Sequence, residues 1–401
     1  MGILRRQWDF WTAIPAALLR LETRFVTALY LQRATILALV TISIVVALDI
    51  SANFDHVMGA GASSAGTGGF FHIIYYSFLR ASFVAPSVLL FAGVWGIVWA
   101  EYSLATSRER IMLFNCGKSY LPALVPALLV GICFGVLHFA ISGFVKPATI
   151  ELESASTHRS YGLKFDRPAQ SKTEWISAGN FIIKARVGIS DDVRLNEVFV
   201  FTFGQGHKLQ RIIRADHARA TTQPNVWQFS DGAVTEFPAA REESSRKPKM
   251  DETRFDVLET ELPLSLLWLE NFGVLPILLP QPLLHDLIRE GDTVPNLYKY
   301  EMAAYERYAS ILYCIAMALL TAHLAMTRFR TDMMPYGALS VAAVGFASYF
   351  FFSITLMLGH YGYIPVVVAA WAIPLLAAIG SILAVFAYVN KPGAASGQLQ
   401  G

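Results

Sequence analysis

The sequence predicts an α-helical membrane protein with six transmembrane helices and one inserted all-β domain outside the membrane. Three long apolar stretches lie toward the N-terminal end, three lie toward the C-terminal end, and a polar block from Glu151 to Lys299 separates the two groups. The chain is 54% hydrophobic and only 15% charged, with a mean hydropathy of +0.45. This composition is too apolar for an ordinary soluble domain.

Each apolar stretch is about long enough to cross a bilayer as a helix. A span needs about 20 predominantly apolar residues at about 1.5 Å rise per residue. The first stretch is short unless residues 29–31 join it, which would place Arg33 among the lipid headgroups. The predicted spans are Thr35–Ile50, His72–Ala100, Leu121–Phe144, Ala303–Met326, Met334–Leu358 and Ile364–Tyr388.

Lysine and arginine in the short connecting segments predict the orientation, because these residues are retained on the cytoplasmic side. The loops 51–70 and 359–363 contain neither residue. We therefore expect both termini in the cytoplasm and the polar block outside. The basic residues on the expected cytoplasmic side are Arg5, Arg6, Arg20, Arg24, Arg33, Arg108, Arg110, Lys118, Arg328, Arg330 and Lys391.

Four regions follow from these boundaries. Residues 1–150 hold an N-terminal interfacial helix around Trp8 to Leu19, the first three spans and a cytoplasmic helix at about 101–118. Residues 151–262 form the β domain, residues 263–302 a helical connector, and residues 303–401 the last three spans with a cytoplasmic tail. In the connector, Gln281–Glu290 is expected to be a short helix that Gly291 ends.

The polar block contains short runs of β-branched and aromatic residues separated by turn-forming residues. Such strands at this spacing predict a sandwich or a jelly roll. The charged segment 241–249 has no periodicity and is expected to be a loop. The predicted strands are Phe181–Val187, Val198–Phe203, Trp227–Phe237 and Thr253–Leu262.

Composition and motifs argue against several classes of function. A net charge of +2 does not indicate nucleic-acid binding. Cys116, Cys133 and Cys314 are too far apart in sequence to suggest a disulfide framework or a metal site. Gly117-Lys118-Ser119 resembles the end of a phosphate-binding loop, but Met112 occupies the position of the required glycine. We therefore predict no catalytic residues, no metal and no nucleotide site in this chain.

Several segments resemble the LptF/LptG permeases of lipopolysaccharide export. Trp175 to Ile183, Leu195 to Phe203 and Trp227 are similar to the β domain of that family. Outside this domain the resemblance continues through Leu283–Gly291, Tyr305–Tyr308 and Gly359–Pro365, so it covers nearly the whole chain. The tryptophan-containing β domain favours the LptG-like member of the pair.

The resemblance implies that the chain is a permease subunit of an ABC transporter in the bacterial inner membrane, with its β domain in the periplasm. Its implied partners are a second LptF/LptG-type permease, a cytoplasmic LptB-like ATPase dimer and a periplasmic jelly-roll bridge of the LptC/LptA kind. The ATPase would bind ATP and Mg, and lipopolysaccharide would pass to the bridge. Such a substrate requires an apolar cavity open to the bilayer and a few cations near its outer rim.

The segment between the second and third spans resembles the helix that couples permease to ATPase in this family. Glu109 takes the position of the coupling glutamate and could pair with an arginine of the ATPase. The alternatives are an ordinary solvated loop helix, or Glu101 as the coupling carboxylate. The other candidate coupling residues are Arg108, Arg110, Ile111, Met112, Phe114 and Gly117, of which the large apolar ones are expected to be exposed and to fill a groove.

Candidate substrate-binding residues lie in two places. Arg80 is predicted about a third of the way into its span, where it would either contact substrate phosphates or pair with Asp49. In the β domain, inward-facing side chains would either form an ordinary core or hold acyl chains, as the interior of the family's jelly roll does. These candidates are Phe181, Ile183, Phe199 and Phe201.

Two other functional classes remain open from the sequence. One is a permease of another ABC exporter, for lipoproteins or peptides, although six spans argue against it. The other is a membrane-anchored enzyme acting on lipids or the cell wall. Such an enzyme needs a cluster of catalytic groups, and the exterior acidic and histidine pairs are scattered without a supporting motif.

Overall fold

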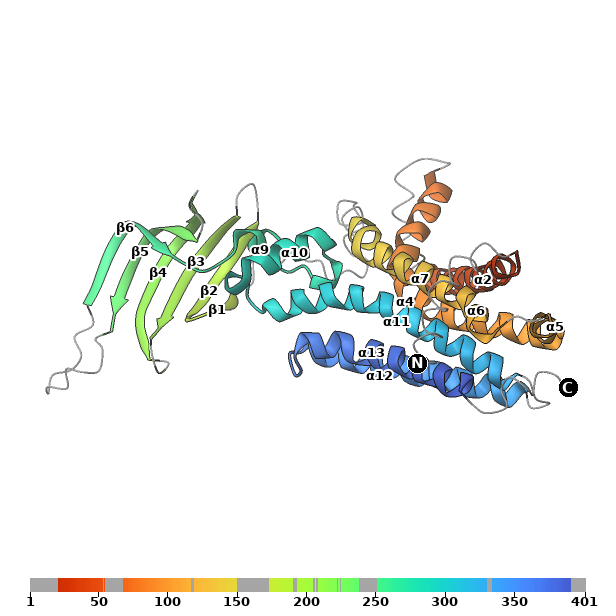
Figure 1. Ribbon diagram of the computed structural model, residues 1–401. Coiled ribbons are helices and arrows are strands. Elements are labelled where there is room, and N and C mark those ends of the chain that lie inside the picture. Colours follow the sequence, from red (N-terminus) through yellow and green to blue (C-terminus); the bar gives the residue numbers. More distant parts are fainter. Residues whose placement is uncertain are drawn as a thin grey trace. The chain divides into compact units, whose positions relative to one another are not determined.

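The computed structural model describes residues 21–52, 54, 68–116, 119–149, 173–189, 193–204, 206, 208–221, 223, 225–237, 251–329 and 334–390. The chain divides into two compact units, one formed by residues 1–159 and 302–401 and the other by residues 160–301 (Figure 1). The predicted interfacial helix at 8–19 and the predicted loop at 241–249 lie outside the described residues.

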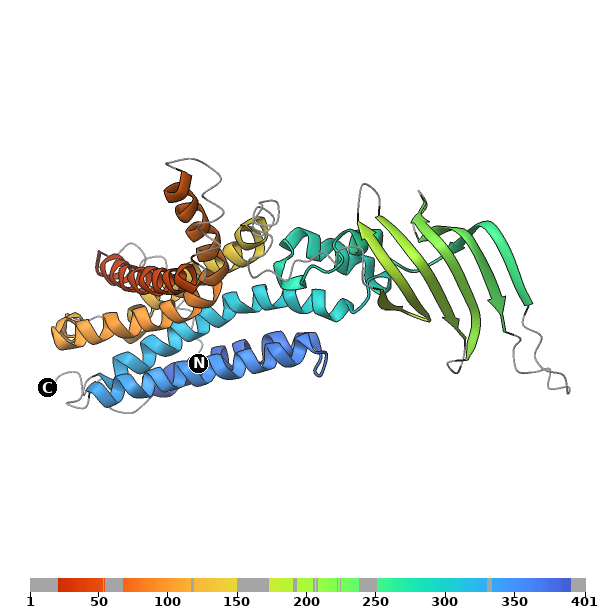
Figure 2. The ribbon, with the colours of Figure 1, turned by 180° about the vertical axis from the view of Figure 1, so that it is seen from behind.

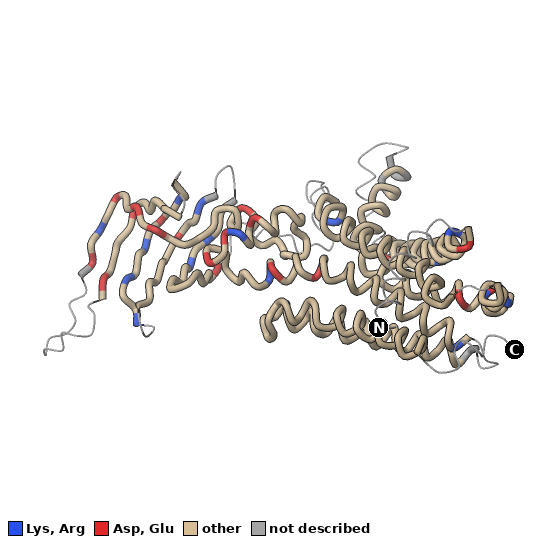
Figure 3. Tube along the Cα trace, in the orientation of Figure 1, with Lys and Arg blue, Asp and Glu red and all other residues tan. Residues whose placement is uncertain are grey.

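Within the described residues, six helices are long and apolar enough to cross a membrane, as predicted. Charged residues are sparse along them and gather in the other unit and near the helix ends (Figure 3). The fold class of six membrane helices with an inserted β domain is thereby confirmed. The helices are α2 (Leu21–Ala52), α4 (Gly68–Thr106), the run of α6 (Tyr120–Ala123), α7 (Val125–Ala140) and η1 (Ile141–Val145), α11 (Leu297–Arg328), α12 (Met334–His360) and α13 (Val366–Val389).

Helix α2 is longer than the predicted first span, because it begins at Leu21 rather than near Thr35. The length of an apolar run reflects the thickness of the hydrocarbon core of the membrane. A helix can continue beyond this core, because its backbone hydrogen bonds do not depend on apolar side chains. The added turns carry Arg33, whose guanidinium lies 4.3 Å from the ring centroid of Trp99 on α4. The arginine is therefore held by a cation–π contact.

The third span is divided. Pro126 stands in the first turn of α7, and the π-helix η1 interrupts the span shortly before its end at Thr149. A proline lacks the N–H that an inner helical turn requires, so it belongs at a helix start.

Small residues bring the membrane helices close together. A Cβ atom on Gly96 of α4 would lie 2.4 Å from Cα of Ala34 on α2. On α7, a Cβ on Gly131 would lie 2.8 Å from Cα of Ile315, and one on Gly135 would lie 3.0 Å from Cα of Ile311. Glycine lets helix backbones approach in this way in membranes, where dispersion contacts replace the hydrophobic effect.

The unit of residues 160–301 contains one antiparallel sheet in which the described strands follow in sequence order (Figures 1 and 2). Its described strands thus form a single meander instead of the two sheets of a sandwich. Each strand pairs with the next along the chain, so hairpins suffice to connect them. The strands are β1 (Glu174–Ala178), β2 (Phe181–Ile189), β3 (Val193–Phe203), β4 (Leu209–Ala220), β5 (Val226–Glu236) and β6 (Asp251–Glu261).

The four predicted strands correspond to β2, β3, β5 and β6, whereas β1 and β4 were not predicted as strands. Strand β4 contains five charged or histidine side chains among its twelve residues, which hide its apolar alternation. Pairing with both neighbours stabilises it as a strand despite this composition.

A helical connector follows the sheet. It contains α9 (Leu266–Glu270), η3 (Pro276–Leu278), α10 (Gln281–Glu290) and η4 (Gly291–Thr293). The bounds of α10 are those predicted, and Gly291 after it has a φ of +60°, which glycine adopts without strain. The side chain of Ser265 caps α9 by accepting a 2.9 Å bond from the Trp268 N–H.

Candidate functional site

A short helix lies where the sequence predicted the coupling segment. Helix α5 (Glu109–Asn115) follows α4 after a turn in which Arg108 has a φ of +60°. This left-handed conformation breaks the helix, so α5 is a separate element from α4. Gly117, the last predicted coupling residue, lies outside the described residues.

The two faces of α5 differ in exposure. Ile111 is 45% exposed and Met112 is 62% exposed, and Glu109 is exposed beside them. The other face carries Arg110 and Phe114, which are buried and four residues apart, as neighbours on one helix face are. One side of α5 therefore offers a carboxylate and two apolar side chains, and the other side packs against the protein.

The expectation that Phe114 is exposed is wrong. Its ring stacks on that of Tyr120 at 6.5 Å between centroids, and the side chain belongs to the apolar core between the first spans. The reason is the helical period, because Phe114 falls on the face opposite to Met112. Arg110 is likewise turned inward and does not lie on the exposed face.

Arg110 forms a buried cluster with Glu101 of α4 and Tyr30 of α2. Its Nε donates to Glu101 Oε2 at 3.0 Å, and a second nitrogen bonds the other carboxylate oxygen. That second nitrogen also lies 3.1 Å from the Tyr30 hydroxyl, which itself donates to Glu101. Because Glu101 is only 1% exposed, Glu109 is the carboxylate of the two that an external partner can reach.

Arg80 lies beside Asp49, as one of the two predicted alternatives required. The distance between Arg80 and the carboxylate is 2.9 Å, and the Tyr76 hydroxyl donates to the other carboxylate oxygen at 2.6 Å. The Arg80 side chain remains 27% exposed, and its buried Nε makes no hydrogen bond within the described part of the chain. A donor is thus left over after the ion pair has formed.

A second cation lies near Arg80. The Lys146 ammonium is 4.4 Å from the centroid of the Phe83 ring, and the Arg80 guanidinium is 5.3 Å from the same centroid. Two positive charges are therefore gathered about one aromatic ring on α4.

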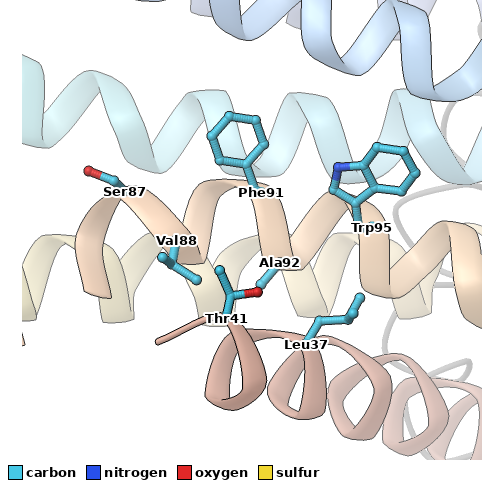
Figure 4. A pocket seen from close by; sticks show the side chains of 7 residues that line it. All are labelled: Leu37, Thr41, Ser87, Val88, Phe91, Ala92 and Trp95. Carbon is cyan, nitrogen blue, oxygen red and sulfur yellow. The ribbon is translucent and has the colours of Figure 1, made fainter. Parts of the chain in front are cut away.

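Helices α2 and α4 enclose an apolar pocket of about 260 Å³. Two of its lining residues come from α2 and five from α4 (Figure 4). Apart from the hydroxyls of Thr41 and Ser87, its lining is apolar, which suits a hydrocarbon chain. The lining residues are Leu37, Thr41, Ser87, Val88, Phe91, Ala92 and Trp95.

The four candidate residues of the sheet do not share one face, contrary to expectation. Ile183 pairs with Val200 and both are fully buried, whereas Phe199 pairs with Lys184. Phe201 lies two residues from Phe199 and therefore shares its face.

Phe181 lies two residues from Ile183 on β2, so its side chain is on the same, buried face of the sheet. Valine and phenylalanine alternate from Val198 to Phe201. Both faces of this part of the strand are therefore apolar, and the sequence alone does not show which face is buried. The register, with a shift between Lys184 and Arg186, places the valines inward.

The opposite face combines aromatic rings with cations. The Lys184 ammonium lies 5.5 Å from the Phe199 ring centroid, and the Arg214 guanidinium lies 5.6 Å from it. The rings of Trp175 and Phe201 stack at 6.0 Å. Phe199 and Phe201 therefore belong to a polar-aromatic surface and not to the buried face.

Sequence reasoning missed Tyr30 and the inward role of Arg110. The available signal was weak, since a tyrosine in an apolar stretch is common at membrane interfaces. Only the return of α5 toward α4 brings the three side chains together.

These features occur in a chain whose sequence matches the family model of the lipopolysaccharide export system permease LptF/LptG over residues 24–386. The chain belongs to this family. A search of curated proteins found no match. Members of the LptF/LptG family are transport permeases, so the chain is a multi-pass permease and its membership implies a role in lipopolysaccharide export.

For an LptF/LptG permease, the three sites have distinct chemistry. The exposed face of α5 can dock a protein, the pocket between α2 and α4 can hold an apolar chain, and Arg80 with Lys146 can attract an anion.

Proposed function

We propose that this chain is one of two permeases of an ABC transporter that extracts lipopolysaccharide from the outer leaflet of the bacterial inner membrane. A periplasmic jelly-roll bridge of the LptC/LptA kind would receive the lipid. The observation that carries the proposal is the family match over nearly the whole chain. It is supported by an arrangement of three spans, a β unit and three spans.

In this proposal the exposed face of α5 docks on an LptB-like ATPase dimer, which binds ATP and Mg. Glu109 pairs with a basic side chain of the ATPase, while Ile111 and Met112 fill an apolar groove. Arg108, exposed at the start of α5, flanks this contact. This face of α5 would lie on the cytoplasmic side, consistent with the basic residues counted in the sequence.

The pocket between α2 and α4 would take part of an acyl chain, and Arg80 would contact a phosphate near the outer side. A phosphate oxygen can accept from the exposed part of the Arg80 guanidinium while the ion pair with Asp49 persists, because the side chain is 27% exposed and the 2.9 Å contact uses only one of its three nitrogens. The buried face of the sheet, with Phe181 and Ile183, would guide acyl chains onward.

The test is affinity capture of the tagged chain from mild detergent, followed by an ATPase assay. The wild-type chain is expected to recover an ABC ATPase and a second six-span permease. Glu109→Arg places a cation against the basic partner, so ATPase recovery and lipopolysaccharide-stimulated hydrolysis should fall at least about tenfold, the loss expected for a charged hot spot.

The matched control is Glu259→Arg, which reverses an exposed carboxylate on β6, in the unit that does not contain α5. It should leave recovery unchanged. Recovery of a lone chain, equally with the wild type and with Glu109→Arg, would contradict the transporter assignment.

A further inference from the structure

Three side chains that are far apart in the sequence meet in a closed polar cluster. Tyr30 comes from α2, Glu101 from α4 and Arg110 from α5, and they are 0%, 1% and 5% exposed. The guanidinium binds both oxygens of the carboxylate, and the tyrosine hydroxyl bonds the carboxylate and contacts the guanidinium at 3.1 Å. One cation and one anion are present, so the cluster carries no net charge.

Stability alone does not account for this cluster. Removing two charges from water is unfavourable, and apolar side chains of similar volume commonly stabilise a buried site as well or better. A bidentate arginine–carboxylate contact does, however, hold its partners in one orientation, which an apolar contact does not. The cluster is therefore suited to holding three helices in a defined relative position.

The backbone between α4 and α5 does not join them into one helix. The helical hydrogen bonds of α4 end at a turn, and Arg108 adopts the left-handed conformation before α5 begins. Because the two helices are not continuous, side-chain contacts help to fix the orientation of α5 on α4, and they link α5 to α2, which is distant in the sequence. Arg110 makes such contacts to both helices, and Phe114 adds an apolar contact on the same face.

The two helices joined by the cluster are also those that enclose the apolar pocket. Leu37 and Thr41 of α2 face the pocket, as do five residues of α4 (Figure 4). Gly96 lies against Ala34 between the cluster and the pocket, so α2 and α4 are closely packed there. A displacement passed to α2 and α4 would move two walls of the pocket relative to the other spans.

We infer that Tyr30, Glu101 and Arg110 form a joint through which α5 moves α2 and α4 during transport. This inference rests on the proposed function, in which α5 docks on the ATPase. Arg110 is a positioning residue, because it touches neither nucleotide nor substrate. The exposed face of α5 receives the movement, and the buried face transmits it.

The experiment uses the whole transporter in lipid vesicles containing lipopolysaccharide. It measures ATP hydrolysis and, separately, lipopolysaccharide released to the soluble bridge protein. In the double variant Glu101→Leu/Arg110→Met the site remains filled by apolar side chains, so the complex should assemble and hydrolyse ATP. Lipopolysaccharide released per ATP should nevertheless fall at least about fivefold, the lower end of typical coupling between sites.

Two single variants complete the series. Arg110→Lys keeps the charge but loses the two-pronged contact, so the release per ATP should be intermediate. Arg24→Met removes an exposed arginine of α2 that has no part in the cluster or in the proposed docking face, and it should leave the release per ATP unchanged. If the double variant fails to assemble, the comparison of Arg110→Lys with Arg24→Met still tests the inference.

A second readout separates this inference from the proposed function. Spin labels at exposed Leu39 of α2 and exposed Phe346 of α12 report movement of α2 when ATP is added. The wild type should show a distance change that the double variant loses. Equal release per ATP and an equal distance change in both would overturn the joint. A wild-type transporter that moves without releasing lipopolysaccharide would contradict the proposed function and leave the joint supported.

Discussion

Several charged side chains in the spans or beside them are held by specific partners. Arg80 binds Asp49, Arg110 binds Glu101, and the His360 ring lies 2.9 Å from a Glu306 oxygen. A charged residue near the middle of a span costs about 2.5–3.5 kcal/mol on insertion scales. Pairing each charge with an opposite or hydrogen-bonding group offsets this cost.

At Arg80 the two predicted roles can be separated by combining variants. If Arg80 contacts a phosphate, Arg80→Gln should weaken lipopolysaccharide binding roughly thirtyfold, since a hydrogen bond to a charged group contributes about 2 kcal/mol. Asp49→Asn should preserve or strengthen binding, because it leaves the cation without a competing carboxylate. Binding of labelled lipopolysaccharide to the purified transporter provides the measurement.

The double variant Arg80→Gln/Asp49→Asn distinguishes a purely internal ion pair. In that case both single variants would lower the thermal midpoint and weaken binding together, and the double variant would restore both. Lys146→Gln removes the other cation beside Phe83. Its effect shows how much a positive charge near Arg80 contributes to lipopolysaccharide binding without a specific contact by Arg80.

At the scale of elements, periodicity decides which side chains can act together. In α5 it separates Glu109, Ile111 and Met112 from Arg110 and Phe114. In β3 the same principle separates Val198 and Val200, which are fully buried, from Phe199 and Phe201. Large aromatic residues on a strand therefore need not be the ones that face inward.

Photo-crosslinking to lipopolysaccharide should differ between the two faces of the sheet. Photo-reactive benzoylphenylalanine at Phe181, which shares the face of Ile183, is expected to form lipopolysaccharide adducts during ATP-driven transport. The same replacement at Phe199 should form few or none, because its ring lies on the opposite face beside Lys184. Both positions are phenylalanines, so the replacements are matched in size. Equal adducts at both positions, or adducts at Phe199 alone, would contradict the assignment of faces.

At the scale of the whole molecule, the membrane helices are unevenly buried. In α11, 67% of the most apolar window is buried inside the protein, compared with 17% in α2, 11% in α12 and 22% in α13. Exposed helix faces of this kind contact lipid or another membrane protein. A second permease of the same family would cover part of them.

This arrangement predicts that the chain is more stable when it is paired. The thermal midpoint in detergent should rise when the chain is purified together with a second LptF/LptG-type permease, because a partner that binds only the folded state stabilises it. Addition of phospholipid to the lone chain is the control for simple covering by lipid. An unchanged midpoint in the copurified pair would mean that these faces contact lipid alone.

The six spans, the inserted β unit, four of the six described strands and the bounds of α10 could all be predicted from the sequence. These features depend on local properties, namely the length of apolar runs, the strand period and the glycine that ends a helix. The family could also be recognised from the sequence, because the segments that resemble it are spread along nearly the whole chain. The sequence also placed Glu109, Arg80 and Asp49 among the candidate residues.

Which candidates face inward, and which partners they have, depends on the packing of the helices and the register of the strands. Tyr30 and Arg110 are 80 residues apart, and Arg80 and Asp49 come from different helices. Such contacts depend on how α2, α4 and α5 pack, and the inward face of β3 depends on its register with β2. The valine face and the phenylalanine face of β3 are both apolar, so the sequence pattern alone could not show which of them is buried.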